Sequence, residues 1–214
     1  MEKLNGLNFI RADLWVFDND GTLYSNPNDL DLAVGELMIQ YVSSYYCVNF
    51  EEAREKRKQL LQKHNTRYTL IALKNEGINE DDFIQKTYLS IKPENYGIRH
   101  SQKLKYLIGS LDGEKIILTN NPSEFANLIL ESLGVKHLFS QVIGMREMGY
   151  IQKPHLEAYN ILKSSFDLGK KVVFIDDEFE NIISAKEAGC CTVYIGANDA
   201  KESDIGDYSM VSLV

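Results

Sequence analysis

Four short runs of apolar residues constrain the fold of this chain more than any other feature. They lie at residues 14–17, 115–118, 171–175 and 191–195. Continuous apolar runs of this length indicate strands that are buried on both faces. A shorter run at 141–143 predicts one more strand. Helical patterns alternate with these runs, and that alternation predicts βαβ units and a parallel sheet.

The helices between the predicted strands have recognisable ends. Pro122 suits the first turn of one helix, with Asn121 as its N-cap and Gly134 at its end. A second helix is expected to begin at Pro154, and a third to span residues 178–188. A helix that returns the chain to the start of the next strand is what parallel pairing requires.

The segment between the first two strands departs from this alternation of strands and helices, because it contains helical patterns and no strand pattern. Four helices are expected there, at residues 30–45, 51–64, 69–75 and 80–89. We therefore expect an α/β core domain at residues 1–24 and 99–214, with a parallel sheet flanked by helices. A small all-helical domain at residues 25–98 is inserted after the first strand.

Composition excludes some classes of function. The 214 residues carry a formal net charge of −8, which disfavours a nucleic acid polymer or an anionic membrane as partner. No run reaches the roughly 20 apolar residues of a membrane span, and the N-terminus lacks the apolar region of a signal peptide. Cys47, Cys190 and Cys191 form an odd set, typical of reduced, mostly buried thiols. We expect a soluble, cytoplasmic protein and leave its oligomeric state open.

Polar side chains that could take part in catalysis or ligand binding follow the predicted strands. They are Asp18 and Asp20, Thr119 and Asn120, Lys153, and Asp176 and Asp177. The carboxyl ends of parallel strands share one edge of the sheet, where open α/β sheets bind ligands. Carboxylates, a lysine and a hydroxyl at one edge suit phosphoryl transfer, which depends on positioning and on stabilising negative charge.

Each carboxylate can be given a role in such a reaction. Asp18 is the expected nucleophile, because a carboxylate can form an aspartyl-phosphate. Attack on a phosphate dianion needs a cation, so we expect Mg²⁺ held by Asp18, Asp176 and a backbone carbonyl near Asp20. Asp20 is expected to protonate the leaving alcohol and then to activate water. Lys153 adds a fixed positive charge.

The remaining groups are expected to bind the phosphate. The Thr119 hydroxyl and the Asn120 backbone N–H can donate to phosphate oxygens, and the following helix N-terminus adds a positive dipole end. Other interpretations remain open at each position: Asp-Gly is a common turn signal, Asn120 could cap a helix, and Lys153 could be an ordinary surface lysine.

The residues match four motifs in order. They are Asp18-x-Asp20-Gly21-Thr22, Thr119-Asn120, Lys153-Pro154 and Asp176-Asp177. In these motifs the chain resembles the haloacid dehalogenase-like (HAD) phosphohydrolases. The resemblance implies a Rossmann-like sheet with a mobile helical cap that closes over the leaving group. It implies Asp18, Asp20, Thr119 and Lys153 as catalytic residues, and Mg²⁺ ligands from Asp18, Asp20 by its backbone, and Asp176. Asp177 is expected to act through water or by orienting the site.

A narrower resemblance, to the pyrimidine 5'-nucleotidase branch, spans most of the chain. It rests on residues 20–24, on Leu30, Val34 and Tyr41-Val42, and on residues 64–73, 76–78 and 81–83 of the inserted segment. The chain departs from that branch at Asn19, where the branch has an apolar residue, and in lacking a glycine near residues 65–67. The resemblance implies a phosphatase of pyrimidine nucleoside monophosphates. A phosphatase of sugar phosphates or other small phosphate esters is the alternative.

Two alternatives lie outside this class. A phosphoaspartate signalling domain shares an acidic pair, a threonine and a lysine, but its acceptor aspartate follows the acidic pair in sequence. A catalytically silent binding protein could keep the fold. Within the inserted domain, His64, Arg67 and Tyr68 are candidates for reading the leaving group of the substrate.

Overall fold

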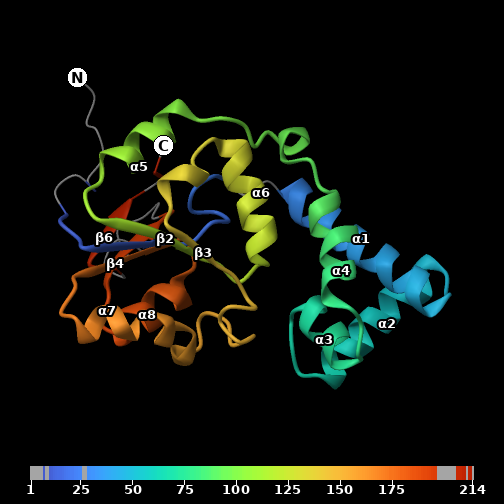
Figure 1. Cartoon of the computed structure of the whole chain (residues 1–214). Coiled ribbons are helices and arrows are strands. Elements are labelled where there is room, and N and C mark those ends of the chain that lie inside the picture. Colours follow the sequence, from blue (N-terminus) through green and yellow to red (C-terminus); the bar gives the residue numbers. More distant parts are fainter. Residues whose placement is uncertain (1–6, 8–9, 26–27, 197–205, 211, 214) are drawn as a thin grey trace. The chain divides into compact units, whose positions relative to one another are not determined.

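The chain divides into two structural units in the computed structural model, which describes residues 7, 10–25, 28–196, 206–210 and 212–213. One unit comprises Met1–Ser25 and Ile98–Val214, and the other comprises Asn26–Gly97. In Figure 1 the colours follow the residue number, so the segments of each unit can be identified along the chain. Among the described residues, no helix is long and apolar enough to span a membrane.

The first unit contains a six-stranded, fully parallel sheet in the order β3-β2-β1-β4-β5-β6. The strands are β1 (Leu14–Phe17), β2 (Glu114–Leu118), β3 (Gln141–Ile143), β4 (Val172–Asp176), β5 (Cys191–Ile195) and β6 (Tyr208–Met210). The predicted α/β class is confirmed. The sequence did not indicate β6, because its three residues are exposed or half-buried and form no apolar run.

Helices cover both faces of the sheet (Figure 1). They are α5 (Gln102–Ser110), α6 (Ser123–Leu133), η4 (Lys136–Leu138), η5 (Leu156–Leu162), α7 (Lys163–Asp167) and α8 (Phe179–Glu187). From β1 the chain moves through β2 to β3 on one side, then crosses to β4 and β5 on the other. Because crossovers are right-handed, this reversal places α5 and α6 opposite α7 and α8. The reversal lies between β1 and β4, where such sheets bind ligands.

Alternate residues of the strands pack on opposite faces. Leu14 and Val16 belong to a buried cluster with Tyr159 of η5 and Ile182 of α8. Trp15 lies between them in sequence on the other face and is 1 % exposed. Its indole N–H donates to the backbone carbonyl of Asp112 at 2.6 Å. Burial on both faces explains why these strands read as continuous apolar runs.

The second unit is helical throughout its described part. It contains α1 (Asn28–Tyr46), α2 (Phe50–Lys63), α3 (Thr69–Asn75), α4 (Glu80–Lys86), η2 (Tyr88–Ser90) and η3 (Pro93–Tyr96). Its buried residues include Leu30, Leu73 and Phe83. Phe83 packs edge-on against Tyr41, with ring centroids 5.0 Å apart.

Some local predictions were wrong. The helix expected at Pro154 begins at Leu156 as a 3₁₀ helix and only then becomes α7. The helix expected at 80–89 ends at Lys86, and a short 3₁₀ turn follows. All three cysteines are free thiols, but Cys47 is exposed while Cys190 is buried. Burial raises the pKa of the Cys190 thiol to about 12.

Candidate active site

The ends of β1 and β4 bring two carboxylates to the point where the strand order reverses. Asp18 directly follows β1 and is 7 % exposed, and Asp176 is the last residue of β4 and fully buried. The Lys153 ammonium lies between them. Its Nζ is 2.7 Å from Asp18 Oδ1 and 2.7 Å from Asp176 Oδ2. Three residues from distant parts of the chain thus form one buried ionic group.

Electrostatics within this group favour a charged lysine. Burial alone would lower the pKa of Lys153, but the Asp176 and Asp18 carboxylates outweigh burial and raise the pKa. For Asp18, burial raises the pKa, the Lys153 ammonium opposes the rise, and the Asp176 carboxylate adds to it. The single positive charge of Lys153 therefore does not neutralise the negative charges of the carboxylates around it.

Asp177 adds a third carboxylate. Asp18, Asp176 and Asp177 each offer an oxygen, and these atoms lie within 4.8 Å of one another. Burial and the Asp176 charge raise the pKa of Asp177 to about 6. The Thr22 hydroxyl donates to Asp177 Oδ1 at 3.0 Å and favours its ionised form. The cluster contains Asp18 and Asp176, the two carboxylates predicted as direct metal ligands, together with Asp177, which was expected to act through water or by orienting the site.

Gly21 makes room for this cluster. A Cβ atom at Gly21 would lie 2.0 Å from Asp177 Oδ2, and the backbone there has a φ of +84°. Both the lack of a side chain and the left-handed conformation require glycine. The glycine of the first motif therefore has a packing role at the site as well as a role in the turn.

The Asp20 carboxylate lies outside the three-carboxylate cluster and has its own partners. The Tyr24 hydroxyl donates to Asp20 Oδ1, and Asn121 Nδ2 donates to Asp20 Oδ2 at 3.0 Å. Asn19 is fully buried, with Nδ2 3.4 Å from Asp20 Oδ2. The prediction that Asn121 caps the following helix is wrong, because Pro122 holds the N-cap position and Asn121 reaches Asp20.

The second motif, Thr119-Asn120, contacts Asn121 and the segment that carries Lys153. Thr119 is 1 % exposed, and its hydroxyl oxygen accepts from the Asn121 N–H at 3.1 Å. The Asn120 side chain holds the backbone of Lys153. Its Oδ1 accepts from the Lys153 N–H at 2.9 Å, and its Nδ2 donates to the Lys153 carbonyl at 2.9 Å. Asn120 thereby fixes the segment that carries the ammonium.

Sequence reasoning missed three residues of this region. Asn181 Nδ2 lies 3.1 Å from both oxygens of Asp176 and, with the Glu178 N–H at 2.8 Å, orients that carboxylate. Tyr24 and Asn121, which hold Asp20, were assigned other roles or none. Asn181 lies five residues after Asp176, in the first turn of α8, and that spacing is a signal that the sequence offers.

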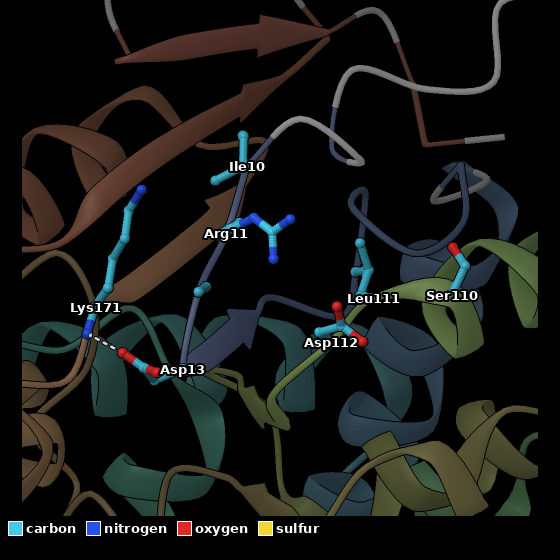
Figure 2. A pocket seen from close by; sticks show the side chains of 8 residues that line it. Ile10, Arg11, Asp13, Ser110, Leu111, Asp112 and Lys171 are labelled. Atoms are coloured by element: carbon cyan, nitrogen blue, oxygen red, sulfur yellow. Dashed lines mark hydrogen bonds between the residues drawn. The ribbon is translucent and has the colours of Figure 1, made fainter.

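A cavity of about 490 Å³ lies elsewhere in the first unit, at the opposite edge of the sheet (Figure 2). Its lining comes from the segments that precede β1, β2 and β4, and includes Arg11, Asp13, Asp112 and Lys171. The Asp13 carboxylate there accepts from the Lys171 backbone N–H at 2.8 Å. Because the carboxylate cluster follows the strands rather than precedes them, this cavity does not belong to the candidate active site.

The three candidates in the helical unit bond within that unit. His64 Nε2 lies 2.5 Å from Glu76 Oε1. Arg67 Nε donates to the Tyr68 hydroxyl at 2.9 Å, and the guanidinium lies over the Tyr68 ring. Their predicted role in reading the leaving group stays a prediction.

The sequence matches a known family over most of its length. The haloacid dehalogenase-like hydrolases match residues 12–189, and the chain belongs to that family. A phosphoglycolate phosphatase of Pasteurella multocida is 35 % identical over 78 residues, which are 36 % of this chain and 34 % of that protein. The chain thus matches about a third of the length of such relatives. A glyceraldehyde 3-phosphate phosphatase of Methanocaldococcus jannaschii is 25 % identical over 92 % of both chains.

Solved structures agree on the fold. A HAD-hydrolase of Bacillus subtilis, bound to magnesium, has a TM-score of 0.57 and 18 % identity, covering 95 % of this chain and 96 % of its own. A 2-haloacid dehalogenase of Pseudomonas syringae has a TM-score of 0.61 and 18 % identity. The match covers 94 % of this chain and 95 % of the dehalogenase. Proteins that include a dehalogenase thus share this fold, so the reaction must be argued from the site.

Proposed function

We propose that the protein is a Mg²⁺-dependent phosphomonoesterase that acts through an aspartyl-phosphate on Asp18. The observation that carries this proposal is the buried group in which Lys153 bridges Asp18 and Asp176. A buried lysine beside a buried carboxylate nucleophile provides positive charge where a phosphate dianion must approach. A resemblance in fold alone would not provide that argument.

The residues present fit a divalent cation. Asp18, Asp176 and Asp177 bring three carboxylates within 4.8 Å, and one ammonium offsets only one of their negative charges. Hard oxygen ligands of this kind suit Mg²⁺. We propose Asp18, Asp176 and the Asp20 backbone carbonyl as ligands, with Asp177 acting directly or through water. The bound ion would offset charge on the phosphate and keep Asp18 ionised.

In the first step of the proposed reaction, an Asp18 carboxylate oxygen attacks phosphorus. The bond between phosphorus and the ester oxygen breaks, and Asp20 gives its proton to the departing alcohol. In the second step Asp20 takes a proton from water, whose oxygen attacks phosphorus and releases Asp18 and inorganic phosphate. Thr119, the Asn120 backbone N–H and Lys153 hold the phosphate oxygens. Acid–base help of this kind contributes typically 10²–10⁴-fold.

The substrate we propose is a small phosphate ester, such as phosphoglycolate or a three-carbon sugar phosphate. Support comes from the two relatives that carry such names, one over a third of its length and one over nearly all of it. The pyrimidine nucleotide that the sequence suggested has no support from these relatives. His64, Arg67 and Tyr68 remain candidates for specificity within the helical unit, which we propose is the cap.

A screen of phosphate release tests the proposal. The purified protein is assayed with Mg²⁺ against phosphoglycolate, glyceraldehyde 3-phosphate, uridine monophosphate and p-nitrophenyl phosphate. We expect turnover of the small esters, loss of turnover in EDTA, and recovery with Mg²⁺. Asp18→Asn should be inactive yet folded, and Asp167→Asn, at an exposed position in α7, is the matched control. Full activity of Asp18→Asn would refute the nucleophile.

A further inference from the structure

Each oxygen of the Asp20 carboxylate accepts a hydrogen bond from a side chain that takes no part in the proposed reaction. The Tyr24 hydroxyl donates to Oδ1, and Asn121 Nδ2 donates to Oδ2 at 3.0 Å. One hydrogen bond leaves a carboxylate free to rotate about its own axis. Donors at both oxygens fix its rotation as well as its position.

Tyr24 is itself held in place. It is 8 % exposed, and its backbone forms a parallel bridge with Asp20. The Leu23 N–H donates to the Asn19 carbonyl at 3.0 Å and closes the turn between them. The tyrosine therefore approaches Asp20 from a hydrogen-bonded turn in its own segment of chain.

The backbone of Asn121 is held by two hydrogen bonds. Its N–H donates to the Thr119 hydroxyl oxygen at 3.1 Å, and its carbonyl accepts from the Met145 N–H at 3.1 Å. Gly144 permits this close packing, because a Cβ there would lie 2.7 Å from the Asn121 carbonyl oxygen. Asn121 lies 101 residues from Asp20 in sequence, so its contact ties the second motif to the first.

We infer that Tyr24 and Asn121 are positioning residues for Asp20, an inference that rests on the proposed function of Asp20 as acid and base. Proton transfer needs the carboxyl group within hydrogen-bond reach of the ester oxygen as the bond breaks. A misplacement of about 1 Å can cost on the order of 100-fold in rate. The two donors hold the carboxyl group in one orientation throughout the reaction.

This role predicts a dependence on the leaving group. An alkyl alcohol leaves poorly without a proton, whereas p-nitrophenolate leaves readily as an anion. The value of kcat/KM reports only the steps up to loss of the alcohol, so it isolates the role of Asp20 as acid. Removing a positioning residue should lower kcat/KM for an alkyl ester far more than for p-nitrophenyl phosphate.

The test measures kcat/KM for Tyr24→Phe and Asn121→Ala with p-nitrophenyl phosphate and with phosphoglycolate or glyceraldehyde 3-phosphate, whichever the wild type hydrolyses faster. We expect a loss of about 10-fold or more with the alkyl ester and less than about 3-fold with the aryl ester. Tyr106→Phe, which changes a tyrosine that is 65 % exposed, and Asn127→Ala, whose amide bonds Ser123, should change neither value.

A double-mutant cycle provides the second readout. In an Asp20→Asn background, Tyr24→Phe should cause no further loss with the alkyl ester, because the group it positions has already lost its function. Equal losses on both esters, or a full further loss in the Asp20→Asn background, would overturn the inference while leaving the proposed function intact. A wild type that hydrolyses neither ester would overturn both. Thermal unfolding shows whether each variant folds. The variants at Tyr24 and Asn121 test the inference independently, because they change different donors to Asp20.

Discussion

Lys153 determines the charge balance of the candidate site. Its side chain is 1 % exposed, and its ammonium is bonded to the Asp18 and Asp176 carboxylates, whose side chains are 9 % and 0 % exposed. Buried charges are tolerated only when paired, and breaking such a pair leaves an uncompensated charge in a medium of low dielectric constant. The residue is therefore important to the stability of the protein as well as to the proposed chemistry.

Lys153→Met should lower the free energy of unfolding by about 3–5 kcal/mol in metal-free buffer. The matched control is Lys136→Met, which removes a surface ion pair with Glu131 and should cost less than about 1 kcal/mol. Urea unfolding followed by the fluorescence of Trp15, the single tryptophan, reports on the unit that contains both lysines. Equal losses for the two variants would show that the buried pair does not contribute as described.

Gly21→Ala separates packing at the site from backbone strain. A Cβ at Gly21 would meet Asp177, whereas Gly77, with a similar φ of +81°, has no atom within 4 Å of such a Cβ. Both substitutions should destabilise the protein by about 1–2 kcal/mol through strain. Only Gly21→Ala should also weaken Mg²⁺ binding. The measurement is the Mg²⁺ concentration that gives half-maximal rate, which should rise in this variant. A similar change in Gly77→Ala would contradict the role of Gly21.

At the scale of elements, burial decided what the sequence could predict. The strands β1 and β4 are buried at every position, β2 and β5 are buried at three of their five positions, and their apolar runs marked all four. The edge strand β6 is short and half-exposed, so no pattern announced it. The start of η5 was misplaced because Pro154 fits the first turn of any helix. In the structure the Asn120 side chain bonds the Lys153 backbone, and the His155 N–H donates to the Gln152 carbonyl in a turn that precedes η5.

The start of α2 carries a capping box that can be tested. The Asn49 side chain accepts from the Glu52 N–H at 3.0 Å, and the Glu52 carboxylate accepts from the Asn49 N–H at 3.2 Å. Asn49→Ala should lower the free energy of unfolding by about 0.5–2 kcal/mol. The control Asn95→Ala, at an exposed position in η3, should stay within about 0.5 kcal/mol of wild type. Urea unfolding followed by far-ultraviolet circular dichroism measures both, and indistinguishable variants would show that the box does not stabilise α2.

At the scale of the molecule, the site was predictable where its residues follow strands directly. Asp18, Thr119 and Asp176 each stand at or just after the end of a strand, so the parallel topology alone brought them to one edge. Asn121 and Asn181 do not follow strands directly, so the topology alone did not mark them, although the five-residue spacing of Asn181 from Asp176 was available in the sequence. Their side chains act on carboxylates through tertiary geometry, and an asparagine near a helix N-terminus is as readily a cap.

Binding of Mg²⁺ should stabilise the whole first unit, because the carboxylates that would hold the ion come together only in the folded chain. A ligand that binds only the native state at about 100 times its Kd adds about 2.7 kcal/mol to the free energy of unfolding. The melting temperature, followed by Trp15 fluorescence, should therefore rise when Mg²⁺ replaces EDTA at constant ionic strength. Asp176→Asn should abolish the rise, and Asp167→Asn should retain it. Because no turnover is measured, an absent rise in the wild type would count against the metal site whatever the substrate.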